Sequence, residues 1–167
     1  MNKLAAVIAA SVLSASMPTI AAAELPTQQV LPLAAAQKMV AACLELAGKN
    51  KWTMSIAIKD SADDLLAFAR MDGAGLETVN FSQMKASTAT RFGAPTSGLA
   101  KFAFDAKTKA PTALAFFPGI VLFGGGLPIK SAAGQMLGSI GVSGGPMPDS
   151  DEKCAQAGLD AVKDDLK

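Results

Sequence analysis

The sequence contains no histidine and no tyrosine, only one tryptophan, and few charged residues, 17% of the chain. The missing histidine removes the usual general base, the usual zinc or copper ligand and the usual haem ligand. Residues 141–145 (GVSGG) fit the G-x-S-x-G motif of hydrolases, but that motif needs a histidine base, so a Ser-His-Asp hydrolase is excluded. We therefore interpret this segment as a strand that ends in a glycine turn, whose backbone N–H groups could hold an anion.

The chain also has almost no net charge, since it contains 15 basic and 14 acidic residues. A balance this close to zero argues against nucleic acid and against an anionic membrane surface as partners. The apolar fraction of 50% fits a chain that buries surface in a homo-oligomer.

Residues 1–23 have the pattern of a secretory signal peptide. Lys3 gives a positive start, residues 4–13 are apolar and too short to span a bilayer, and three alanines at 21–23 offer a cleavage site. The sequence thus predicts a periplasmic or secreted protein whose residues 24–167 form a single domain.

Cysteine is limited to Cys43 and Cys154. An oxidising compartment permits a structural disulfide. Both cysteines fall in predicted helices, so the choice between a disulfide and two buried thiols depends on whether those helices pack side by side.

The order of predicted elements indicates an α+β fold with an antiparallel sheet and helices packed on it. A hairpin (52–59 and 65–71) turns at residues 60–63, helix 78–91 carries Phe81 and Phe92, and helix 97–109 has Phe102 and Phe104 as apolar anchors. Asp149 or Asp151 is the expected N-cap of the last helix. Helices are expected at 33–48, 78–91, 97–109 and 154–166, strands at 52–59, 65–71, 120–123 and 135–142, and 113–117 is ambiguous.

Glycines crowd the stretches 124–129 (GGGLPI) and 137–145 (LGSIGVSGG). Glycine permits turns with positive φ and close approach of other groups. We expect two strands here that meet tight turns beside a pocket.

Four ordered segments of the chain resemble the GlcG/HbpS family, also called DUF336 or haem-degrading domains. They are residues 58–60 (IKD) with 69–74 (ARMDGA), 82–89 (SQMKASTA) with 94–96 (APT), 125–129 (GGLPI), and 138–145 (GSIGVSGG) with Asp151, Cys154, Ala155 and 157–159 (AGL). The resemblance implies a profilin-like fold with a five-stranded antiparallel sheet, often assembled into a homo-oligomer. Members include haem-binding proteins, domains attached to corrinoid adenosyltransferases and accessory proteins of glycolate utilisation, so the fold is better defined than the ligand.

The chain departs from this family in two places. Asp63 stands where members commonly carry glycine in the first hairpin turn, and aspartate tolerates the left-handed region at some cost. The absence of histidine means that a histidine axial ligand cannot be carried over to this chain.

The candidate ligand-binding residues are mainly cationic side chains and residues of the glycine-rich stretch 124–129. Arg70 and Arg91 are the only arginines, and each either caps its element or clamps carboxylates such as haem propionates. Lys85 can pair with a ligand carboxylate or with Asp72. The predicted ligand-binding set is Arg70, Asp72, Lys85, Arg91, Thr96, Gly125, Gly126 and Pro128, with no catalytic residue.

Two further motifs do not indicate a function in this chain. Ser82 and Lys85 fit the S-x-x-K nucleophile motif, but its S-D-N and K-T-G partners are missing from the chain. Residues 149–152 (DSDE) could bind a hard cation and are more simply a helix N-terminus.

Haem, if bound, is non-covalent because the chain has no C-x-x-C-H motif. The axial ligand stays open among side chains that are more often structural. These are Met71, Met84, Met136, Met147, Lys85, Cys43, Cys154 and Thr96.

Three functions are compatible with these observations. The first is an exported, oligomeric binding protein for haem or another tetrapyrrole, which we favour. The second is an enzyme or enzyme accessory for a small carboxylic or hydroxy acid, with Lys85 beside Ser82 and Thr88. The third is an interaction protein without a ligand.

Overall fold

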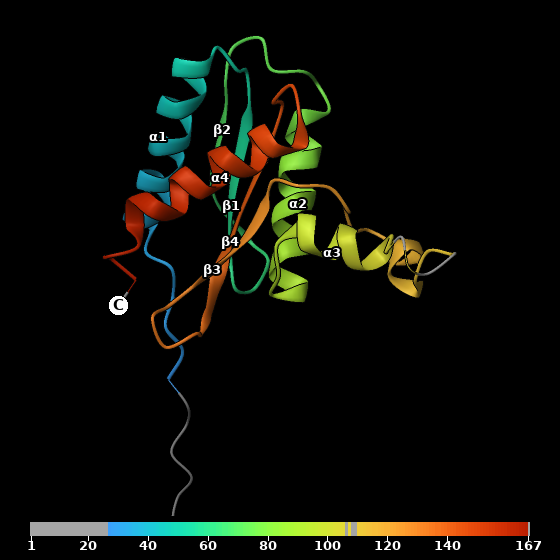
Figure 1. The fold of residues 1–167 in the computed structure, drawn as a ribbon. Coiled ribbons are helices and arrows are strands. Elements are labelled where there is room, and N and C mark those ends of the chain that lie inside the picture. Colours follow the sequence, from blue (N-terminus) through green and yellow to red (C-terminus); the bar gives the residue numbers. More distant parts are fainter. Residues whose placement is uncertain (1–26, 106, 108–109, 167) are drawn as a thin grey trace, which may run out of the picture.

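The computed structural model describes residues 27–105, 107 and 110–166, so the predicted signal peptide lies outside the described residues. Four strands, β1 (Ser55–Asp60), β2 (Leu65–Arg70), β3 (Gly126–Lys130) and β4 (Met136–Ser143), form one antiparallel sheet in the order β2-β1-β4-β3. Helices α1 (Leu33–Asn50) and α4 (Pro148–Val162) pack together on one face, and α2 (Thr78–Phe92) covers the other (Figure 1). The α+β class with an antiparallel sheet is therefore confirmed.

The sheet separates large apolar side chains from small ones. Along β4, Ile140 and Val142 join the core under α1 and α4, whereas Ser139 and Gly141 face α2. Strand alternation places successive residues on opposite faces in this way. A Cβ on Gly141 would lie 2.0 Å from the carbonyl oxygen of Ser82, so only glycine lets the backbone of α2 come this close.

A disulfide between Cys43 and Cys154 joins α1 to α4 in the core. The two Cα atoms are 4.8 Å apart, which shows that the two helices pack side by side as the disulfide requires. The sequence leaves open whether the two cysteines form a disulfide or stay as buried thiols, and the structure shows the disulfide.

Several predicted boundaries are wrong by a few residues. Helix α1 continues past Gly48 to Asn50, and Lys51, at φ 58°, ends it in the left-handed conformation. Helix α4 begins at Pro148, after Met147 as N-cap, so neither Asp149 nor Asp151 caps it.

The segment 120–123 is not a strand. It belongs to none of the ladders, and the strand predicted there begins instead at Gly126, after the glycine turn. Within the described residues the sheet has four strands, so the five-stranded profilin-like arrangement is not confirmed.

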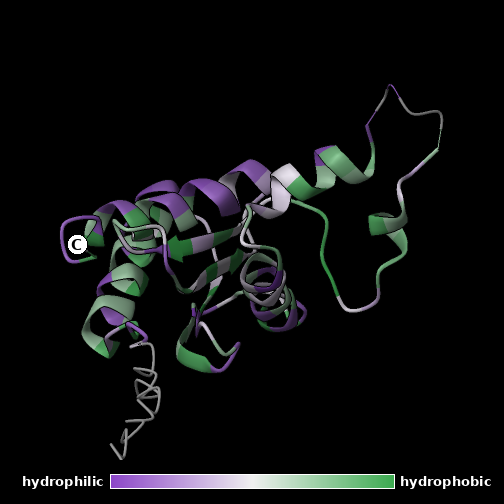
Figure 2. Cartoon of the chain, turned by 90° about the horizontal axis from the view of Figure 1, so that it is seen from below, coloured by the Kyte–Doolittle hydropathy of each residue, from purple (hydrophilic) through white to green (hydrophobic). Residues whose placement is uncertain are grey.

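The chain between α2 and β3 makes an excursion from the sheet. Helix α3 (Thr96–Ala103) ends earlier than the predicted 97–109, and the ambiguous 113–117 contains a short 3-10 helix, η1 (Ala113–Phe116). The described residues from α3 to η1, 96–105, 107 and 110–116, are called the arm below. It extends away from the body of the molecule (Figure 1), and its backbone is coloured mostly as hydrophobic (Figure 2).

Over the described ranges, no helix combines the length and the apolar character that crossing a bilayer demands.

Candidate functional site

Lys85 is fully buried on α2 and holds the centre of the glycine-rich region. Its Nζ donates to the Asp151 Oδ2 at 2.6 Å and to the carbonyl oxygen of Val142 at 2.9 Å, and it lies 4.5 Å from the ring centre of Phe123. The other Asp151 oxygen accepts a hydrogen bond from the Gly145 N–H at 2.7 Å. Lys85 and its partner Asp151 thus connect α2 to β4, to the turn that follows β4 and to the start of α4.

Burial sets the ionisation of this pair. Removal from water lowers the pKa of Lys85 and raises the pKa of Asp151, while their mutual attraction and hydrogen bond oppose both shifts. The partner of Lys85 is Asp151, not Asp72 as the sequence suggested.

The glycine turn at 124–126 is filled by this cluster. A Cβ on Gly125, which has φ 118°, would lie 2.7 Å from the Cβ of Asp151 and 3.0 Å from the Nζ of Lys85. A Cβ on Gly126 would meet the Lys85 carbonyl oxygen at 2.4 Å, and its N–H donates to the buried hydroxyl of Thr96 at 3.0 Å. The structure brings four of the predicted site residues, Lys85, Thr96, Gly125 and Gly126, together in close packing.

The S-x-x-K motif has no free amine. Ser82 is buried and donates to the carbonyl oxygen of Val79 at 3.0 Å, and the Nζ of Lys85 has its own partners. A nucleophilic serine needs a base within hydrogen-bond reach. This arrangement therefore gives no support to Ser-Lys catalysis.

Arg70 and Asp72 lie away from this cluster, at the end of β2 and in the loop after it. Arg70 donates to the carbonyl oxygen of Ala74 at 2.7 Å, and both side chains are exposed. Within the described chain, no ion pair joins Arg70 to Asp72.

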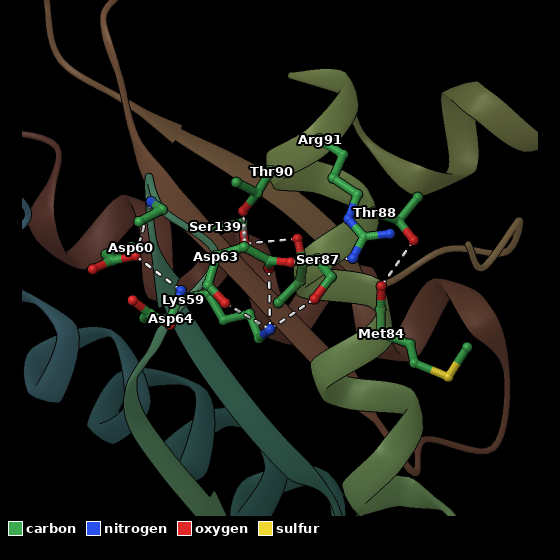
Figure 3. A network of polar contacts seen from close by, with 12 residues as sticks. Lys59, Asp60, Asp63, Asp64, Met84, Ser87, Thr88, Thr90, Arg91 and Ser139 are labelled. Atoms are coloured by element: carbon green, nitrogen blue, oxygen red, sulfur yellow. Dashed lines mark hydrogen bonds and ion pairs between the residues drawn. The ribbon is translucent and has the colours of Figure 1, made fainter. Parts of the chain in front are cut away.

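Arg91 lies near the end of α2, beside the β1–β2 turn (Figure 3). Its guanidinium is half-exposed and approaches the Asp63 carboxylate at 3.5 Å. Asp63, at φ 70°, adopts the left-handed conformation in the turn and also pairs with Lys59 at 3.1 Å, which donates to Ser87 at 2.8 Å. The hairpin turn therefore forms with aspartate in place of glycine, and the ion pair between Asp63 and Arg91 connects the turn to α2.

Pro128 faces a different part of the surface. It lines a groove of about 350 Å³ between the β3–β4 hairpin and the end of α4, together with Lys130, Gln156, Leu159 and Lys163. The eight predicted site residues thus divide among four places in the fold, and their role in ligand binding stays a prediction.

The acidic run at the start of α4 is occupied by protein contacts. Asp151 pairs with Lys85, and Glu152 accepts from Ser97 at 2.9 Å. Across the residues that the structure describes, no group of three potential metal ligands comes together.

The outer side of α2 carries an exposed apolar surface that the sequence reading missed. Phe81 and Phe123 contact edge to face with ring centres 5.6 Å apart, as do Phe92 and Phe117 at 5.9 Å, and Met84 lies between them in sequence. All five side chains are more than a third exposed. We call Phe81, Met84, Phe92, Phe117 and Phe123 the aromatic face.

Helix geometry and one hydrogen bond place these residues together. Residues 81, 84, 88 and 92 follow the three-to-four spacing of one helix side. Thr88, in the middle, accepts the N–H of Val121 at 3.0 Å, which holds the segment 117–123 along α2. In Figure 3 the Met84 thioether points away from the sheet and from the Lys59–Asp63 network.

The family follows from comparison with known proteins. The family model described as "Haem degrading protein HbpS-like" matches residues 31–160. The chain belongs to the HbpS-like family. Protein GlcG of Escherichia coli K12 is 35% identical over 117 residues, which are 70% of this chain and 84% of GlcG.

Solved structures of other proteins share the fold. A double mutant of HbpS from Streptomyces reticuli is 36% identical, with a TM-score of 0.74 over 89% of this chain and 98% of that one. A structure described as a PduOC:heme complex is 23% identical, with a TM-score of 0.71 over 80% and 95% of the two chains. The second likeness concerns the fold alone.

Proposed function

We propose that this HbpS-like protein binds haem, or a related tetrapyrrole, non-covalently on its aromatic face. The observation that carries the proposal is this cluster of four phenylalanines and one methionine, exposed on α2 and the segment 117–123. The family description supports the choice of ligand.

The chemistry of the face fits a haem. Phenylalanine rings offer apolar contact to a porphyrin. We propose that Arg91, which is half-exposed beside Asp63, would pair with a propionate. Met84 is the exposed sulfur on this face and a soft ligand suited to haem iron. A bound haem would supply the iron and its redox chemistry, and the chain would supply the apolar contact and the charge.

Three of the other candidate ligands to iron fit less well. Cys43 and Cys154 form the disulfide, and the amine of Lys85 is bonded to Asp151 and Val142 under Phe123. We propose that Lys85, Thr96, Gly125 and Gly126 act by fixing Phe123 in the face. The geometry gives Arg70, Asp72 and Pro128 no place at this surface.

Location and assembly belong to the same proposal. We propose an exported protein, because a disulfide of this kind persists in an oxidising compartment such as the periplasm. We also propose a homo-oligomer, because a surface with this much exposed apolar area is seldom left uncovered.

The test is a hemin titration of residues 24–167, followed by the Soret absorbance. We expect a saturable Soret shift, weakened at least tenfold by the double substitution Phe81→Ser and Met84→Ser. Phe68→Ser is the matched control, since Phe68 is equally exposed on β2, outside the aromatic face. A double variant that binds hemin as tightly as the wild type would contradict the location of the site.

A thermal-shift screen separates this proposal from the small-acid alternative. Stabilisation by hemin and not by small carboxylic or hydroxy acids supports haem binding. Stabilisation by an acid alone would favour the enzyme or accessory function, and no shift with either would favour an interaction protein.

A further inference from the structure

The arm exposes aromatic side chains that its own chain does not cover. Phe102 is 64% exposed, Phe104 is 56% exposed and Phe116 is 76% exposed. Helix α3 meets the rest of the molecule mainly at its start, where Thr96 bonds Gly126 and Ser97 bonds Glu152. Figures 1 and 2 show the arm projecting from the body, with η1 at its far end.

The apolar area on the arm and the aromatic face matches that of a stable interface. A phenylalanine can bury about 150–250 Å², so the exposed parts of the seven phenylalanines and Met84 present roughly 800 Å² per chain. A standard protein–protein interface buries about 800 Å² per partner, which the arm and the aromatic face supply together.

We propose that the arm packs on the aromatic face of a second copy of this chain, and that the second copy does the same in return. The two uncovered surfaces lie on one chain, one on the projecting arm and the other on the side of α2. A two-fold axis lets each copy cover both, so no other partner is needed. The near-neutral charge of the chain offers no strong electrostatic attraction for a different partner.

This contact also completes the ligand site. The aromatic face of one chain can cover only one side of a planar tetrapyrrole, and phenylalanines of the partner's arm would cover the other. Haem then lies between α2 of one copy and the arm of the next. The placement of haem rests on the proposed function above, whereas self-association through the arm does not.

The first experiment compares oligomeric states by sedimentation velocity with and without hemin. The arm variant carries Phe102→Ser, Phe104→Ser and Phe116→Ser, all at exposed positions, and Phe68→Ser is again the control. Circular dichroism and the melting temperature check that each variant is folded. We expect the wild type and the control to be dimers or larger and the arm variant to be smaller, with hemin affinity lowered at least tenfold.

A mixing experiment tests whether the arm acts on its partner. The arm variant and the Phe81→Ser, Met84→Ser variant each lack one half of every site. In a two-fold dimer that exchanges freely, an equal mixture regains about a quarter of the wild-type hemin sites, because each mixed dimer restores one of its two sites. No recovery would show that the arm does not complete its partner's site.

The outcomes separate the two proposals. A wild type that is monomeric with and without hemin, or an arm variant that keeps the wild-type assembly, overturns the arm contact. Wild-type hemin affinity in the arm variant overturns the shared site and leaves haem binding intact. An arm-dependent oligomer that binds no hemin removes the proposed function and leaves the interface.

Discussion

Lys85 shows how a single residue organises the glycine-rich region. It is a charged side chain with no exposure, and it is tolerated because Asp151, the Val142 carbonyl and the Phe123 ring surround its amine. Buried charges need such partners, since removing one partner leaves an uncompensated charge. The glycines at 125 and 126 leave the room that this cluster occupies.

The substitution Lys85→Met should therefore destabilise the fold by about 3–5 kcal/mol, because it strands the Asp151 carboxylate in the interior. Adding Asp151→Asn removes the stranded charge and keeps an acceptor for the Gly145 N–H. We expect the double variant to recover most of the loss in urea denaturation. A double variant that loses the sum of both single effects would show that the two residues are not coupled.

Asp63 makes the hairpin contact sensitive to acid. Partial burial pushes its pKa upward, but Ser87, Lys59 and Arg91 outweigh burial and hold the pKa below the ordinary value of 3.8. The folded pKa is depressed, so the ionised group adds stability above the unfolded pKa, and this stability is lost as pH falls through the folded pKa.

The substitution Asp63→Asn tests this pH dependence, because asparagine also tolerates the left-handed conformation. We expect the variant to be less stable than the wild type at pH 7, with the difference shrinking as pH falls through and below 3.8. Thermal melts at a series of pH values measure this difference. A constant difference at all pH values would mean that charge is not its cause.

At the scale of elements, α2 explains which parts of the site the sequence predicts. Its length and helical character follow from the spacing of apolar residues. The glycines predict a close approach of other groups, but the sequence does not predict that the Lys85–Asp151 pair makes it. The spacing does not predict which side of α2 faces the sheet, because two sides of the helix carry residues that could pack against it. The side against the sheet holds Ser82, Ala86 and Ala89, since Gly141 brings the backbones together.

The same close approach turns the large side chains of α2 outward. Phe81, Met84 and Phe92 lie on the exposed side of α2, and Phe102 and Phe104, predicted to be apolar anchors, are exposed on the arm. The spacing of apolar residues in one sequence shows only that one side of a helix is apolar. A side that binds a partner or a ligand has the same spacing as a side that packs in the core. The glycine on the facing strand was the signal that could have identified the buried side.

The disulfide between α1 and α4 is the covalent link between distant parts of the chain. It closes a loop of 111 residues, so the entropy of the unfolded chain predicts a stabilisation of about 4–5 kcal/mol. The double substitution Cys43→Ala and Cys154→Ala should lower the free energy of unfolding by about this amount, measured with guanidinium chloride. Unchanged unfolding of the wild type after full reduction would contradict the role of the disulfide.

At the scale of the whole molecule, the distribution of phenylalanine is the feature that most needs a function. All eight phenylalanines are more than a third exposed, and seven of them belong to α2, the arm and the segment that returns along α2. The core is built instead from alanine, isoleucine, valine and methionine around the disulfide. Family membership explains the sheet and its helices, and the outward phenylalanines indicate what the surface meets.

Hemin affinity tests the central claim most directly, measured side by side for the wild type, the Phe81→Ser, Met84→Ser variant and the Phe68→Ser control. Our account predicts saturable binding that the double variant loses by tenfold or more and the control retains. Equal affinity in all three proteins, or no saturable binding by the wild type, would contradict it.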